Sequence, residues 1–119
     1  LNIDAMSEAA ASLLGSHDFS SFQTAPTDNK NPHCRLLQSE LRRQGDLIVC
    51  SFYADRFLKQ MVRTLVGTLV EVGRGKRPAS DMSTVLTARS RPAAGRTAPA
   101  HGLYLVRVDY DLGSIPPAT

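Results

Sequence analysis

The segment that most constrains the fold is a run of apolar side chains between residues 55 and 72. Pairs of apolar residues recur there every four positions, namely Phe57, Leu58, Met61, Val62, Leu65, Val66, Leu69 and Val70. This spacing is typical of an α-helix with a broad buried face. The opposite side carries Lys59, Gln60, Arg63, Gly67 and Glu71. The pattern therefore predicts a long amphipathic helix over residues 55–72, which must bury its apolar face against another layer.

Two strand-like runs precede this helix, over residues 35–42 and 47–54, and a turn near Gln44-Gly45 joins them as a hairpin. The other expected elements are a helix from Asn2 to Leu14, a short helix from Ser80 to Ala88, a strand from Leu103 to Tyr110 and a flexible tail over residues 111–119. The order helix, strand, strand, long helix, short helix, strand predicts an α+β fold. In such a fold a largely antiparallel sheet packs against helices.

The two cysteines are predicted to be free thiols. Pairing about the expected turn places Cys50 opposite Ser39 and Cys34 opposite Asp55. The two sulfurs are then roughly 16 Å apart, at about 3.3 Å per residue, whereas a disulfide needs Cα atoms within about 7 Å. No spacing of cysteine and histidine suits zinc either, since the histidines are far apart in the sequence, at His17, His33 and His101. We therefore expect no metal site.

Charge is distributed unevenly along the chain. Residues 1–55 carry a net charge of −3, whereas residues 56–107 hold ten Lys/Arg against two Asp/Glu, a net charge of +8. A basic segment of this kind favours a polyanionic partner, with nucleic acid as the leading candidate. A basic surface that serves only solubility is the alternative. The candidate phosphate contacts are Lys59, Arg74, Lys76, Arg77, Arg89, Arg91 and Arg96.

No segment has the features of a signal peptide or a membrane span. Leu1 is not followed by a charged region and an apolar run. The uncharged stretch at residues 64–70 is far shorter than the roughly 20 residues that a spanning helix needs. We therefore expect a cytoplasmic protein with no membrane partner, and the missing initial Met indicates a truncated or processed chain.

Three blocks of sequence resemble the tRNA pseudouridine synthase A family. Residues 57–73 are similar to F-L-x-x-M-V-R-N-I-V-G-T-L-x-x-V-G of that family, and residues 97–105 to T-A-P-A-x-G-L-Y-L. Upstream, residues 14–22 resemble L-G-x-H-D-F-x-S-F. The blocks occur in the family's order and span most of residues 3–110. The resemblance implies that residues 1–119 are the C-terminal part of the catalytic domain, a pseudouridine-synthase-like half domain.

The resemblance also implies a chemistry. Members of the family isomerise uridine to pseudouridine in the anticodon stem-loop of tRNA, at positions 38–40, without a cofactor, and act as homodimers. An aspartate in a G-R-T-D-x-G-V-H motif starts the reaction, and the target base must leave the stack. This chain has no such motif, since residues 95–98 read G-R-T-A and run into the T-A-P-A block. We therefore expect this chain alone to be inactive.

The active-site residue that this half is expected to supply is Arg63, because the family's M-V-R arginine pairs with the catalytic aspartate. An arginine keeps its charge and offers a planar fork to a carboxylate. Gly67, one turn later, leaves room for a second backbone or a base. By resemblance the substrate pocket includes Gly67, Leu103, Tyr104 and Leu105, although a plain core strand explains the last three equally well.

Two other interpretations remain open at this point. One is an RNA-binding or dimerisation module that kept the fold and lost the chemistry, and the other is a basic domain with no role in RNA binding. Some residues depart from the family pattern, including Gln23 for arginine and Thr64 for asparagine. These departures affect the expected docking of tRNA but not the argument for Arg63.

Overall fold

The computed structural model describes residues 1–23, 31–58, 60–98 and 104–110, the last range by its backbone. Its helices are α1 (Ile3–Ala11), α2 (Met61–Gly73) and α3 (Asp81–Ala88), and its 3-10 turns are η1 (Ser20–Phe22) and η2 (Arg91–Ala93). Its strands are β1 (Gly15–Asp18), β2 (His33–Gln44), β3 (Leu47–Ala54) and β4 (Tyr104–Tyr110). The predicted α+β class is confirmed. The predicted tail, Lys59 and Leu103 lie outside the described residues.

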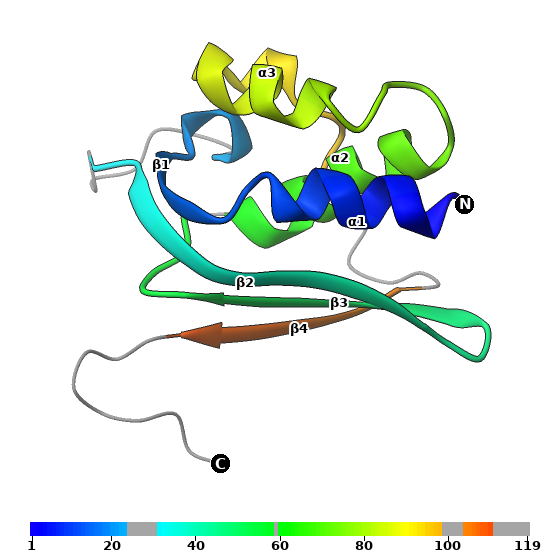
Figure 1. The fold of residues 1–119 in the computed structure, drawn as a ribbon. Coiled ribbons are helices and arrows are strands. Elements are labelled where there is room, and N and C mark those ends of the chain that lie inside the picture. The colour runs from blue at the N-terminus through cyan, green and yellow to red at the C-terminus, as the bar shows by residue number, and fades with distance from the viewer. Residues whose placement is uncertain (24–30, 59, 99–103, 111–119) are drawn as a thin grey trace.

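The strands form one sheet in the order β1-β2-β3-β4, with two antiparallel pairings followed by a parallel pairing of β3 with β4. All three helices lie on one side of this sheet, and no helix of the described residues covers the other side (Figure 1). The sheet is therefore largely antiparallel, as predicted. Strand β1 was not predicted, because its four residues, G-S-H-D, have no apolar alternation.

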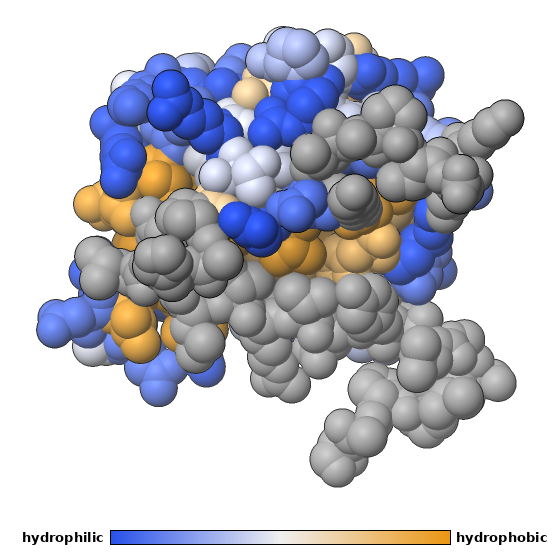
Figure 2. All heavy atoms as spheres, turned by 180° about the vertical axis from the view of Figure 1, so that it is seen from behind, coloured by the Kyte–Doolittle hydropathy of each residue, from blue (hydrophilic) through white to orange (hydrophobic). Residues whose placement is uncertain are grey.

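The core lies between the sheet and the helices. Its largest fully buried side chains include Phe19, Phe22 and Phe52, with Met6 from α1 and Leu65 from α2. Phe19 and Phe22 are fully buried, with ring centroids 6.2 Å apart, so both are core residues. Seen from behind, the helix layer is mainly hydrophilic, and hydrophobic surface gathers below it (Figure 2). The apolar face predicted for the long helix is thus buried against the sheet.

The predicted long helix begins six residues too early. Helix α2 starts at Met61, after Gln60 in the left-handed conformation at φ 62°. Leu58 is 7% exposed and fills the core from the connection between β3 and α2. Its backbone N–H donates to the Met61 sulfur at 3.5 Å. The connection before Met61 is not helical, but it also packs against the core. The apolar period therefore continues into it.

The β2–β3 hairpin has a different register from the one predicted. Gln44 pairs with Leu47, so the turn residues are Gly45 and Asp46, and Cys50 lies opposite Leu41 instead of Ser39. Cys34 pairs with His17 of β1. Gly45 adopts φ +62°, the left-handed conformation that tight hairpins favour. The expectation of free thiols is nevertheless confirmed, and both side chains are buried.

Candidate active site

A short extended segment crosses the polar side of α2, and we call residues 95–98 the strap. It runs antiparallel to the helix, from Glu71 and Thr68 at its beginning to Arg63 at its end. Its hydrogen bonds to α2 are Gly95 N to Thr68 Oγ1 at 2.9 Å, Arg96 N to Glu71 Oε2 at 3.1 Å, Thr97 Oγ1 with Thr64 Oγ1 at 3.3 Å and Ala98 N to Arg63 O at 2.9 Å. The side of α2 predicted to face outward is therefore partly covered by a second piece of backbone.

Gly67 allows this close approach. A Cβ atom at Gly67 would lie 1.7 Å from the Arg96 carbonyl oxygen and 2.9 Å from its carbon. Both are backbone atoms, so no side-chain rotation would relieve the overlap. Of the two neighbours predicted for Gly67, a second backbone or a base, the structure places a backbone there.

Arg63 is held by the end of the strap. Its Nε–H donates to the Ala98 carbonyl oxygen at 2.9 Å, while Ala98 N–H donates to the Arg63 carbonyl oxygen at the same distance. The side chain is half-buried. No carboxylate among the described residues forms an ion pair with Arg63. Because the strap uses only the Nε donor, the two terminal nitrogens are available for a planar, bidentate contact with a carboxylate.

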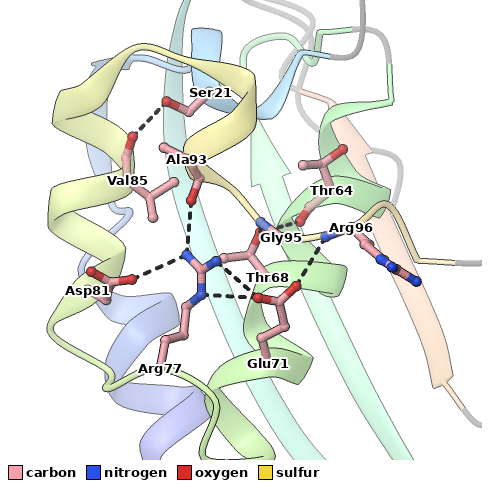
Figure 3. Close-up of polar contacts among 10 residues, drawn as sticks. All are labelled: Ser21, Thr64, Thr68, Glu71, Arg77, Asp81, Val85, Ala93, Gly95 and Arg96. Atoms are coloured by element: carbon pink, nitrogen blue, oxygen red, sulfur yellow. Dashed lines mark hydrogen bonds and ion pairs between the residues drawn. The ribbon is translucent and has the colours of Figure 1, made fainter.

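A charged cluster anchors the beginning of the strap (Figure 3). The Arg77 guanidinium forms ion pairs with Glu71 at 3.0 Å and Asp81 at 3.3 Å and donates to the Ala93 carbonyl oxygen at 3.1 Å. The Arg77 side chain is 18% exposed. Two carboxylates thus more than neutralise its charge. Among the predicted phosphate contacts, Arg77 is the one that the structure uses to join α2, α3 and the residues before the strap.

Four of the other described cations of the predicted set form two groups. Arg91 and Arg96 lie near Arg63: Arg91 donates to Thr97 Oγ1 at 3.1 Å, and Arg96 is exposed on the strap. Arg74 and Lys76 are exposed beyond the other end of α2. Arg74 lies eleven positions after Arg63, about 16 Å along the axis at 1.5 Å per residue. The basic residues therefore line the helix layer and do not converge on one point.

Arg89 belongs to a separate contact at the end of β1. Its side chain is 68% exposed and lies 3.8 Å from the Asp18 carboxylate, which also accepts hydrogen bonds from the backbone N–H and hydroxyl of Ser20. Burial raises the pKa of Asp18, but the Ser20 hydrogen bonds, with Arg89 and His33, outweigh it and bring the pKa below its ordinary value. Asp18 is therefore ionised at neutral pH and fastens η1 to the sheet.

The predicted pocket residues of the last strand are described by their backbone. Tyr104 pairs with Ile48 and Leu105 with Val49 in the parallel β3–β4 ladder. Both belong to the sheet layer, opposite the helices (Figure 1). Their proposed contact with uracil remains a prediction.

Three residues that hold the strap escaped prediction because their partners are distant in sequence. Thr64 and Thr68 are fully buried on the side of α2 that the strap covers, and Thr68 Oγ1 donates to the Thr64 carbonyl oxygen at 2.9 Å. Glu71 is the third. The available signal was the spacing: two threonines four residues apart flank Gly67, and buried hydroxyls require partners.

Neither metal ligands nor a membrane span emerges from the described part of the chain. It contains no group of three His, Cys, Asp or Glu side chains arranged to hold a metal ion. Among the same residues, no helix combines the length and hydropathy that crossing a bilayer requires.

Comparison with known proteins shows the family to which this chain belongs. The sequence profile of the family described as tRNA pseudouridine synthase matches residues 9–111. This chain therefore belongs to the tRNA pseudouridine synthase family. Among individual relatives, the tRNA pseudouridine synthase A of Paraburkholderia phymatum is 49% identical over 110 residues, which are 92% of this chain and 41% of the relative.

Two further relatives carry the same name. That of Burkholderia mallei is 46% identical over 119 residues, covering 99% of this chain and 44% of the relative. That of Anoxybacillus flavithermus is 41% identical over 111 residues, covering 93% and 45%. The chain thus spans less than half the length of the curated relatives it matches.

Proposed function

We propose that this chain is the C-terminal half of the catalytic domain of a tRNA pseudouridine synthase, and that Arg63 pairs with the catalytic aspartate of the other half. The observation that carries the proposal is the state of Arg63. Its side chain is half-buried and fixed through Nε, and no described carboxylate pairs with it. A partly buried cation of this kind favours a carboxylate partner, because an unpaired buried charge is costly.

In the proposed reaction the aspartate of the other half attacks the target nucleotide at its base or sugar. The C1′–N1 glycosidic bond breaks, the uracil turns, and C5 bonds to C1′. The bond between the aspartate and the nucleotide then breaks, and the proton lost from C5 is balanced by one gained at N1. Arg63 keeps the aspartate ionised, since a nearby cation lowers a carboxyl pKa, and its fork holds the carboxylate in one orientation. This chain contributes no aspartate to the chemistry, because it contains no G-R-T-D-x-G-V-H motif, and the similar G-R-T-A of the strap runs into the separate T-A-P-A block. The 119 residues alone are therefore inactive.

The substrate in this proposal is the anticodon arm of tRNA, with positions 38–40 as targets. Five described cations remain as phosphate contacts, namely Arg74, Lys76, Arg89, Arg91 and Arg96. Lys59 lies outside the described residues, and the charge of Arg77 is already balanced. The flipped uracil would meet Leu103, Tyr104 and Leu105. The complete enzyme is a cytoplasmic homodimer in this account. Light scattering of the purified protein tests the dimer through its molar mass.

The test uses the full-length protein, meaning the polypeptide encoded by the reading frame that contains these residues. Arg63→Ala should abolish pseudouridine formation in tRNA and leave tRNA binding largely intact. Arg42→Ala, which removes an exposed arginine from β2, is the matched control and should stay active. Turnover by Arg63→Ala would remove Arg63 from the active site. A wild-type protein that binds tRNA without forming pseudouridine would instead favour the non-catalytic RNA-binding module.

A further inference from the structure

We infer that the strap is a positioning element, in which Gly67, Thr68 and Glu71 hold residues 95–98 so that the Ala98 carbonyl orients the Arg63 guanidinium. The inference deepens the proposed function and rests on it. None of the three residues contacts Arg63 through its side chain. Their effect on the reaction would pass through the backbone of the strap.

The contact at Arg63 restricts the direction in which its fork points. Arginine has a long, flexible side chain and a planar guanidinium whose five donors have fixed relative directions. The 2.9 Å bond from Nε to the Ala98 carbonyl therefore restricts the plane in which the terminal nitrogens lie. Orienting the Arg63 guanidinium before the substrate arrives lowers the activation barrier of the reaction, because the entropy of aligning this group has already been lost.

Thr68 holds the beginning of the strap with a hydroxyl group that has no spare capacity to donate. It donates to the Thr64 carbonyl and accepts from Gly95 N–H, both at 2.9 Å, and the side chain is fully buried. Gly95 is itself close to the helix, since a Cβ atom there would lie 3.0 Å from the Thr68 Cα. Removing the hydroxyl would leave the buried Gly95 N–H without its acceptor.

Glu71 fixes the next residue of the strap, and both of its carboxylate oxygens are occupied. Oε1 pairs with Arg77 at 3.0 Å, and Oε2 accepts from Arg96 N–H at 3.1 Å (Figure 3). Arg77 orients this carboxylate from the side opposite the strap. One turn back along α2, Gly67 leaves the space that the Arg96 carbonyl occupies. The hydrogen bond to Glu71 and the missing side chain at Gly67 together set the distance between the strap backbone and the helix.

The experiment compares variants of full-length protein that alter the strap without touching Arg63. Thr68→Val keeps the shape and removes the hydroxyl, and Thr68→Ser restores it. The control is Thr87→Val, because Thr87 on α3 makes the same kind of bond, to the Ser83 carbonyl at 2.9 Å, but is exposed and away from the strap. We expect Thr68→Val to lower kcat by roughly tenfold or more with KM nearly unchanged, since misplacement of about 1 Å can cost about a hundredfold.

A second readout follows Arg63 directly. In protein labelled with ¹⁵N at arginine Nε, the Arg63 Nε–H signal should exchange slowly with solvent in wild type, Thr87→Val and Thr68→Ser, and faster in Thr68→Val. Gly67→Ala should lower kcat further. If Gly67→Ala does not fold, Thr68→Val carries the test alone, with its melting temperature measured to confirm that it is folded.

The outcomes separate the inference from the function on which it rests. A folded Thr68→Val with wild-type kcat, alongside an inactive Arg63→Ala, would overturn the positioning role and keep the function. Unchanged Arg63 Nε–H exchange in Thr68→Val would overturn it equally, even with a lower kcat, because the loss would then be merely structural. Full activity in Arg63→Ala would overturn both.

Discussion

The charged cluster around Arg77 is expected to be a principal support of the helix layer. Arg77→Met keeps most of the aliphatic length and removes the charge with its contacts to Glu71, Asp81 and the Ala93 carbonyl. The side chains of Arg77 and Glu71 are only 18% and 23% exposed, whereas that of Asp81 is 34% exposed. The contact with Asp81 should therefore be worth the least, since exposed ion pairs contribute about 0–1 kcal/mol.

The magnitude follows from these exposures. A largely buried hydrogen bond to a charged group contributes about 1.5–3 kcal/mol, which applies to Glu71. With smaller contributions from Asp81 and Ala93, the total loss should be about 2–3 kcal/mol. For a chain of 119 residues, about 4 °C is lost per kcal/mol, so the melting temperature should fall by about 10 °C.

Thermal unfolding of the chain, followed by circular dichroism, measures this fall. Lys76→Met is the matched control, because it removes one neighbouring positive charge from an exposed side chain and should cost under about 0.5 kcal/mol. The double variant Arg77→Met with Glu71→Gln should be less destabilised than the two single variants added together, since the more buried carboxylate, Glu71, is then not left as a charge without its partner. A fall of under about 2 °C for Arg77→Met, or strict additivity in the double variant, would refute this reasoning.

Three other expectations follow from the same structure. Burial raises the pKa of the Cys34 and Cys50 thiols from 9.0 to about 11; the folded state thus holds these protons more tightly than the unfolded state. The free energy of unfolding should therefore be insensitive to these thiols below about pH 9 and fall as pH rises through about 11, measured by urea titrations in wild type and the double alanine variant. A pH dependence identical in both proteins would contradict this. The 119-residue chain incubated alone with tRNA should form no pseudouridine, and detected product would refute the need for the other half. The affinity of the full-length protein for tRNA should fall steeply between 50 and 200 mM salt, and Lys76→Ala should make the slope shallower by about one phosphate contact. A slope that does not change would remove Lys76 from the interface.

Much of the fold could be predicted from the spacing of apolar residues along short stretches of the chain. The apolar period predicts α2 from Met61 onward, and the alternation in β2 and β3 predicts the hairpin. The start of α2 was not predictable, because Leu58 is buried from a non-helical connection and the left-handed Gln60 has no distinctive residue type. Strand β1 exists through its pairing with β2, which its own polar sequence does not indicate.

The candidate site divides in the same way. Arg63 and Gly67 were identified because they belong to a long sequence block. The strap was not, because its partners on α2 lie more than twenty residues away in the sequence and contribute a hydroxyl, a carboxylate and backbone atoms. Contacts of this kind leave no period in the sequence. The same is true of Arg77, whose role depends on where Glu71 and Asp81 meet it in space.

The central claim is that Arg63 acts in a pseudouridine synthase, and pseudouridine mapping in cellular tRNA tests it most directly. Cells that lack the full-length gene should lose pseudouridine at positions 38–40 of the anticodon arm. The wild-type gene should restore it, Arg42→Ala should restore it equally, and Arg63→Ala should not. Pseudouridine that persists at all three positions in the deletion strain, or that returns with Arg63→Ala, would contradict the claim.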